Sequence, residues 1–233
     1  MNLLALPAVH GAFKLPFENS YHRLSPGWWR CGSEPNNGCT VDRLNLLRHK
    51  LQDYRLRDFP VRLPEAAVLM PFTDQPDPEL ILTVRSAGMP THAGEVAFPG
   101  GKRDPIDRDL LSTALRESHE EVGLSPEEVE VVAQLSPLAS RFGMKVTPFV
   151  GIVPHDVALL AEEREIDQIF RVPLDFFLDT RPDLSSPIDF YGKKFRIPTY
   201  HYDGKRIWGL TAFMILDLLN NVFDADIPFE ESA

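Results

Sequence analysis

Residues 107–124 constrain the fold of this chain more than any other stretch of the sequence. Small and apolar side chains recur along it at helical spacing: Leu111, Ala114, Leu115, Ser118 and Val122. Asp107 or Asp109 can cap the start of such a helix, and Gly123 can end it in the left-handed conformation that glycine adopts readily. The pattern predicts a helix that packs one face against a core.

The same helix carries a concentrated negative charge. Glu117, Glu120 and Glu121 are three and four residues apart, so they share one helical face, away from the apolar stripe. Like charges at this spacing destabilise an isolated helix, whereas Mg²⁺ or Mn²⁺ prefers several oxygen ligands. A solvated acidic face without function is the competing interpretation of these residues taken alone. We expect the face to be solvated and favour a divalent metal site on it.

The residues around the acidic triplet resemble the Nudix box, the signature of hydrolases that cleave a nucleoside diphosphate linked to another group. That pattern contains Arg-Glu, an apolar residue, any residue, Glu-Glu, any residue, Gly and an apolar residue. The matching residues are Arg116, Glu117, Glu120, Glu121, Gly123 and Leu124, with Ser118 in the first apolar place. The resemblance implies the α/β class: a Nudix-type α/β/α sandwich with a mixed sheet, plus an N-terminal extension.

The first half of the box departs from the general pattern in a way that resembles one branch of the family. Asp107 stands where the pattern has glutamate, and eight residues, instead of seven, separate it from Arg116. The segment Gly-Gly-Lys-Arg-Asp-Pro-Ile-Asp, residues 100–107, looks like the variant of the coenzyme A pyrophosphatase branch. This likeness favours coenzyme A or one of its thioesters as the substrate.

Two more segments resemble the same branch. Upstream of the box, Ile81 to Ser86, Gly94 and Phe98 to Gly101 follow the spacing of its coenzyme A motif. Pro90 stands where that motif has a second arginine, whose planar fork suits a phosphate. Residues 207–212, Ile-Trp-Gly-Leu-Thr-Ala, are similar to the end of the family's domain. The three motifs occur in the order that the family shows.

The resemblance implies a reaction and a role for each matching residue. It implies a Mg²⁺- or Mn²⁺-dependent diphosphatase that yields 3′,5′-ADP and 4′-phosphopantetheine or its acyl form. The expected metal ligands are Glu117, Glu120 and Glu121, and Arg116 is expected to hold these carboxylates in place for catalysis. The expected substrate-binding residues are Arg85, Gly100, Gly101, Lys102 and Arg103, because glycines admit close backbone approach and basic groups neutralise phosphates.

The general base is open between two glutamates. Glu165 precedes a Phe-Arg-Val-Pro-Leu segment, where the family often has a glutamate in a loop that can reach the metal site. Glu162 and Glu163 are close in sequence, so a solvated acidic run is an equal alternative for Glu165. Glu120 is the rival base.

Other functions stay open at this point. The proline that marks the ADP-ribose branch would stand at Ala139, and the tyrosine of the diadenosine polyphosphate branch would stand at Arg141. The array that marks the NADH branch is absent from the sequence. The alternatives are a pyrophosphatase of the ADP-ribose or NADH type and, from another class, a non-catalytic Nudix module that binds a nucleotide. The intact arginine and glutamate set favours an enzyme.

Charge and cysteine content limit the partners and the compartment. The net charge of −10 argues against nucleic acid, because that partner requires a basic face. Cys31 and Cys39 are too few for a disulfide framework. No apolar run reaches the length of a membrane span, and the apolar start lacks the basic residues of a signal peptide. We expect a cytoplasmic protein with a small-molecule substrate and no membrane contact; a homodimer stays open.

The remaining sequence predicts one hydrolase domain between two shorter segments. The expected segments are residues 1–60 as an N-terminal arm and packing helix, with the helix at 41–55, residues 61–225 as the domain, and residues 226–233 as a tail. Apolar runs predict strands at residues 66–72, 80–85, 95–98, 129–135, 146–153, 190–202 and 205–208. Further helices are predicted at residues 166–170 and 174–177, and an amphipathic helix at 210–223.

Overall fold

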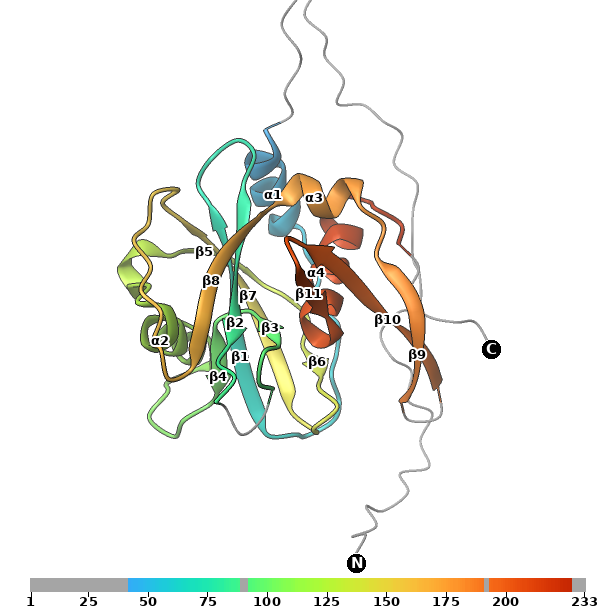
Figure 1. The fold of residues 1–233 in the computed structure, drawn as a ribbon, viewed down its shortest axis with the longest axis horizontal. Helices are drawn as coiled ribbons and strands as arrows, with labels where there is room; N and C mark the ends of the chain where they lie inside the picture. Colours follow the sequence, from blue (N-terminus) through green and yellow to red (C-terminus); the bar gives the residue numbers. More distant parts are fainter. Residues whose placement is uncertain (1–41, 89–91, 191–192, 228–233) are drawn as a thin grey trace, which may run out of the picture. The chain divides into compact units, whose positions relative to one another are not determined.

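The computed structural model describes residues 42–88, 92–190 and 193–227. Within them a mixed sheet lies between helical layers (Figure 1). Helix α2 (Leu110–Val122) covers one face of this sheet, and α1 (Arg43–Gln52) and α4 (Gly209–Val222) lie on the other side. The predicted α/β/α class is confirmed.

The main sheet is built around the parallel pair β1 (Glu65–Thr73) and β7 (Lys145–Val153). They pair without a shift from Glu65 opposite Lys145 to Thr73 opposite Val153. Among the described residues six more strands join them, all in antiparallel pairings: β2 (Glu79–Arg85), β3 (Val96–Ala97), β4 (Gly100–Lys102), β5 (Glu130–Gln134), β6 (Leu138–Ala139) and β8 (Ile166–Pro173). The antiparallel strands therefore flank a central parallel pair.

Alternate residues of the central strands enter two different cores. Ala67 and Leu69 of β1 pack with Ala114 in the core beneath α2. Met70 and Phe72 belong to the larger core, which includes buried leucines of α1 and α4. Successive side chains of a strand point to opposite faces, so a strand that is covered on both faces is apolar at nearly every position.

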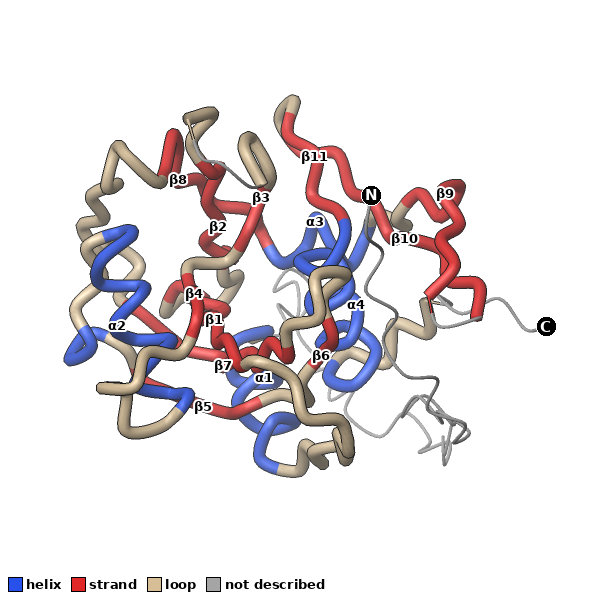
Figure 2. The backbone as a smooth tube through the Cα atoms, turned by 90° about the horizontal axis from the view of Figure 1, so that it is seen from below, coloured by secondary structure: helices blue, strands red, loops and turns tan. Residues whose placement is uncertain are grey.

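A second, three-stranded sheet packs near the last helix. Its antiparallel order is β11 (Lys205–Trp208), β10 (Lys193–Tyr202) and β9 (Asp183–Phe190). Figure 2 shows β10 beside α4, and β10 and β11 both contact this helix. Asp203 and Gly204 both have positive φ, at 47° and 71°, as the tight turn between β10 and β11 requires. The predicted helix at 210–223 is present as α4, but the prediction that it is amphipathic is wrong, because its residues are buried on most sides.

Two predictions of secondary structure are wrong. Residues 166–170, predicted to be helical, belong to β8, which pairs with β2 along its length. Strand β9 was missed, and the predicted strand at 190–202 is in fact the end of β9 followed by β10. The serines and the proline of β9 are poor strand formers, and β9 lies at the edge of its sheet, where proline is tolerated. The other predicted helices and strands are present with shifted ends.

Several of the predicted features belong to residues that the structure does not describe. The N-terminal arm with Cys31 and Cys39, residues 228–233 of the tail, and Pro90 lie outside the described residues. None of the helices in the described ranges is long and apolar enough to cross a membrane.

Candidate active site

Helix α2 holds the acidic side chains and is fixed at both ends. Asp109 caps its start by accepting a hydrogen bond from the backbone N–H of Ser112 at 2.8 Å. Gly123 ends it with φ of 70° in the left-handed region. Backbone N–H groups of Leu160 and Glu162 donate to its last carbonyl groups, both at 2.9 Å. The chain after β7 is therefore attached to the C-terminal end of α2.

Asp107 does not cap the helix, as one alternative predicted, but binds Arg116. Its carboxylate accepts from Nε at 2.9 Å and from Nη2 at 3.0 Å of that guanidinium. The Thr113 hydroxyl and the backbone N–H of Asp104 also donate to it, at 2.9 Å and 2.8 Å. Asp107 is 8% exposed, and the hydrogen bonds from Arg116 hold its pKa well below the usual range of a carboxyl group.

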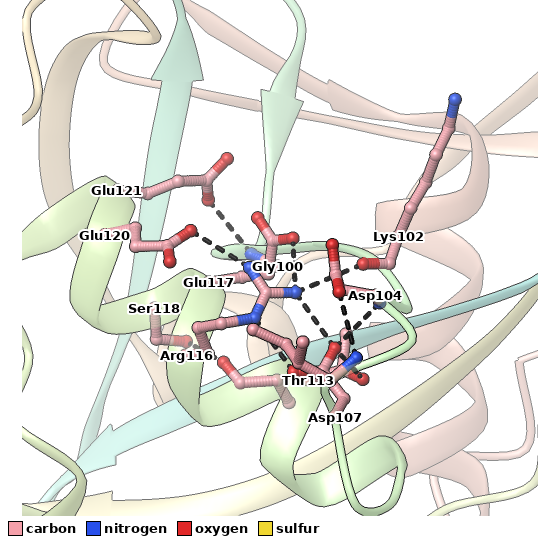
Figure 3. A network of polar contacts seen from close by, with 12 residues as sticks. Gly100, Lys102, Asp104, Asp107, Thr113, Arg116, Glu117, Ser118, Glu120 and Glu121 are labelled. Carbon is pink, nitrogen blue, oxygen red and sulfur yellow. Dashed lines mark hydrogen bonds and ion pairs between the residues drawn. The ribbon is translucent and has the colours of Figure 1, made fainter.

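Arg116 connects this buried carboxylate to two glutamates of its own helix (Figure 3). Nη2 lies 3.0 Å from Glu117 Oε1, and Nη1 lies 3.0 Å from Glu120 Oε2. The same Nη2 donates to the backbone carbonyl of Lys102 at 3.3 Å. The guanidinium thus occupies the centre of the polar network and fixes the direction of both carboxylates.

Glu121 is almost completely buried, which overturns the prediction that all three acids are solvated. It is 3% exposed, because β2 and the turn at Gly100 cover it. Its Oε2 accepts from the backbone N–H of Gly100 at 2.9 Å, and its Oε1 lies 3.2 Å from Nη1 of Arg85. Burial raises the pKa of Glu121 to about 7, although Gly100 and Arg85 act in the opposite direction. Glu120, in contrast, has a side chain that is 57% exposed.

The two glycines of the turn bring the backbone against β1 and α2. A Cβ on Gly101 would lie 2.4 Å from the carboxylate of Glu117. Gly100 has φ of 150°, and a Cβ there would lie 2.4 Å from the backbone oxygen of Ala67. The Gly101 backbone therefore lies directly against the Glu117 side chain, where no larger residue fits without a shift.

Glu165 lies close enough to the acidic helix to influence its charges. Burial is the main cause that raises the pKa of Glu117 and Glu121, and the charge of Glu165 adds to both shifts. The backbone carbonyl of Glu165 accepts from the N–H of Ser86 at 2.8 Å, so this residue is attached to the end of β2 beside Arg85. Its exposed carboxylate therefore belongs to the same neighbourhood.

The predicted basic residues are divided between the site and its edge. Arg85 is in the network, with a side chain that is 18% exposed. Lys102 extends away from the glutamates in Figure 3 and is exposed. Arg103 follows β4 and pairs instead with Glu65 of β1 at 2.9 Å. Sequence reasoning also missed the role of Asp107, although its position in the box was the available signal.

The donor chemistry of the network fits a hard divalent cation. Its carboxylates are those of Asp107, Glu117, Glu120, Glu121 and Glu165, and among the described residues only Arg85 and Arg116 were found to balance them. Within the described ranges, no group of three or more His, Cys, Asp or Glu side chains is arranged to hold a metal ion as it stands. This surplus of negative oxygen ligands is what such an ion requires.

Comparison with known proteins finds a matching family model and several similar proteins. The family model described as NUDIX domain matches residues 63–184. An uncharacterized Nudix hydrolase NudL from Photorhabdus laumondii subsp. laumondii is 43% identical over 157 residues, which are 67% of this chain and 84% of that protein. The NudL protein of Yersinia enterocolitica is 41% identical over 177 residues, 76% of this chain and 91% of that protein. A solved MutT/nudix family protein from Enterococcus faecalis has a TM-score of 0.47 and 14% identity, over 74% of this chain and 66% of that one.

Proposed function

The chain belongs to the Nudix family, and we propose that it hydrolyses the diphosphate linkage of coenzyme A or its thioesters. Nudix hydrolases cleave nucleoside diphosphate derivatives and generally use divalent metal ions such as Mg²⁺ or Mn²⁺. The proposed products are 3′,5′-ADP and 4′-phosphopantetheine, which carries the acyl group when the substrate is a thioester.

The contact between Arg85 and Glu121 is the observation that carries the proposal. Arg85 belongs to the upstream motif that resembles the coenzyme A branch, and Glu121 belongs to the acidic helix. Their side chains meet at 3.2 Å and are 18% and 4% exposed. A motif that occurs outside the box, but contacts a buried carboxylate of the box, supports a substrate specific to that branch. The remaining donors of Arg85 suit a substrate phosphate.

We assign two roles to the residues of the network, metal binding and the positioning of the metal-binding carboxylates. Glu117, Glu120 and Glu121 would hold Mg²⁺ or Mn²⁺, which supplies neutralising charge for the diphosphate and activates water. Arg116 positions the first two carboxylates, and Asp107 in turn positions Arg116.

The turn before the helix supplies the proposed contacts to the substrate. Gly100 and Gly101 allow the backbone to approach the diphosphate, and Lys102 and Arg103 add positive charge at the edge of the site.

Glu165 is the proposed general base. Its carboxylate is exposed and its charge influences both Glu117 and Glu121, so it lies near the place where water would be activated. Glu120, the rival, is already bound to Arg116 at 3.0 Å. A carboxylate without that ion pair is the better proton acceptor.

Product analysis tests the proposal. Coenzyme A, an acyl-coenzyme A, ADP-ribose and NADH are incubated separately with the full chain and Mn²⁺ or Mg²⁺, and Glu121→Gln serves as the control for contaminating hydrolases. We expect coenzyme A or its thioester to be cleaved best, with 3′,5′-ADP as a product. Preferred cleavage of ADP-ribose or NADH would contradict the substrate assignment, and nucleotide binding without turnover in either metal would indicate a binding module.

A further inference from the structure

Three segments that are far apart in the sequence bring aromatic and cationic side chains together outside the acidic network. They are the loop before β3, the loop between β6 and β7, and strand β11. The residues concerned are His92, Arg141, Phe142, Arg206 and Trp208, and we call them the aromatic–arginine patch. Phe142 is 57% exposed, so its ring is accessible to a ligand.

The patch presents flat rings and guanidinium groups to one another. The Arg141 guanidinium lies 4.6 Å from the Phe142 ring centre and 6.0 Å from that of Trp208. The Arg206 guanidinium lies 4.4 Å from the Trp208 ring centre, and the His92 ring meets Phe142 edge-on at 4.8 Å. Arg141 is 61% exposed, and its Nη2 reaches Glu95 only at 3.7 Å. Its charge is therefore still available to an anion.

The backbone attaches the patch to the acidic site. The Glu95 side chain contacts both His92 and Arg141, and the Glu95 carbonyl accepts from the backbone N–H of Arg85 at 3.0 Å. The Arg85 side chain holds the buried glutamate of α2. The Thr211 hydroxyl donates to the carbonyl of Val96 at 3.0 Å, so the start of α4, directly after β11, is fixed to β3. Strand β11 itself contacts β3, and Figure 1 shows these strands side by side.

Only a short length of chain separates Glu95, which contacts the patch, from the turn at the acidic site. Glu95 is five residues before Gly100. Five extended residues span at most roughly 17 Å, which sets an upper limit on the separation of these two positions. A substrate whose diphosphate lies at the acidic helix can thus extend its nucleoside to the patch.

We propose that the aromatic–arginine patch binds the nucleotide end of the substrate, with the base stacked on Phe142 and Trp208 and Arg141 bound to the phosphate on the ribose. The inference rests on the proposed function for the identity of that nucleotide. Aromatic rings bind nucleobases by stacking, and a guanidinium donates paired hydrogen bonds to phosphate oxygens. The two kinds of group occur here side by side.

Discrimination between coenzyme A and 3′-dephospho-coenzyme A tests the role of Arg141. In Arg141→Ala the kcat/KM for coenzyme A divided by that for 3′-dephospho-coenzyme A should fall on the order of ten-fold. This is the effect expected when a charge-assisted contact to the phosphate is lost at a half-exposed site. Arg55→Ala removes another exposed positive charge, outside the patch, and should leave this ratio unchanged. Phe142→Ala should lower kcat/KM for both substrates alike, whereas Leu56→Ala, at a residue that is 55% exposed, should not.

Calorimetry with product nucleotides separates this inference from the proposed function. Without metal, Arg141→Ala should weaken the binding of 3′,5′-ADP on the order of ten-fold and leave that of 5′-AMP within two-fold. Equal weakening of both nucleotides, or of neither, would overturn the role of Arg141. If the wild type binds 3′,5′-ADP through Arg141 but cleaves no coenzyme A, the proposed substrate fails and the patch stands. If it cleaves coenzyme A while the variant discriminates like the wild type, the patch fails alone.

Discussion

Glu121→Gln is expected to abolish activity and, in the absence of metal, to stabilise the fold. Burial raises the pKa of Glu121 from an ordinary 4.5 to about 7. This difference corresponds to about 3 kcal/mol of unfavourable free energy on the ionised side chain in the folded protein. Glutamine keeps an oxygen for the Gly100 N–H but carries no charge, while Arg85 loses its ionic partner. We expect a net gain of about 1–2 kcal/mol at pH 8.

The stability that Glu121→Gln gains over the wild type must grow as the pH rises. The pKa of Glu121 is raised in the folded state, so this group favours folding below its unfolded value near 4.5, and that contribution is lost as the pH rises through about 7. The metal-free wild type and Glu121→Gln should therefore melt together at pH 5 and diverge by roughly 3–6 °C at pH 8. Thermal melts in EDTA across this range measure the effect, and Glu120→Gln, at an exposed side chain, is the matched control.

Bound metal should make the wild type melt at a higher temperature than Glu121→Gln, the reverse of the order expected without metal at pH 8. Mg²⁺ or Mn²⁺ that binds only the folded protein raises the melting temperature of the wild type, and the variant lacks a charged ligand and gains less. Its steady-state turnover should fall by orders of magnitude. A metal-free variant that melts at or below the wild type at pH 8, with no divergence from pH 5, would refute the energetic argument. Turnover close to that of the wild type would refute the metal role.

Other variants test the turn, the central arginine and the base. Gly100→Ala places a Cβ 2.4 Å from a backbone oxygen at φ of 150°, so denaturant melts should show a loss of about 3 kcal/mol. Gly101→Ala meets only the end of a flexible glutamate at 2.4 Å, so it should fold within about 1 kcal/mol of the wild type yet lose most of its turnover. Arg116→Lys loses the paired hydrogen bonds to buried Asp107, and we expect about 2–4 kcal/mol of lost stability in the same melts. Glu165→Gln should lower kcat by about 10²–10⁴-fold at an unchanged melting temperature, and a normal kcat would assign the base to the rival glutamate.

Elements with local signals were predictable, and elements defined by pairing were not. The period of apolar residues, the cap at Asp109 and the stop at Gly123 predicted α2 because all these signals lie within the helix. Strand β8 was predicted to be a helix because its short apolar run fits the periodicity of a helix as well as that of a strand. What makes it a strand is the ladder with β2, from Glu79 opposite Pro173 to Arg85 opposite Ile166, and that partner lies far away in the sequence.

The sequence by itself determined which charged groups share one face of α2, and only the tertiary structure decided the burial and pKa of each group. The spacing of Glu117, Glu120 and Glu121 places three carboxylates on one face of the helix, because helical geometry depends only on nearby residues. It does not tell which of them is buried. The turn at Gly100 and the side chain of Arg85, brought in from other strands, cover Glu121 and leave Glu120 in solvent. Desolvation depends on what covers a group, so the raised pKa of Glu121 is a property of the assembled fold and not of its helix.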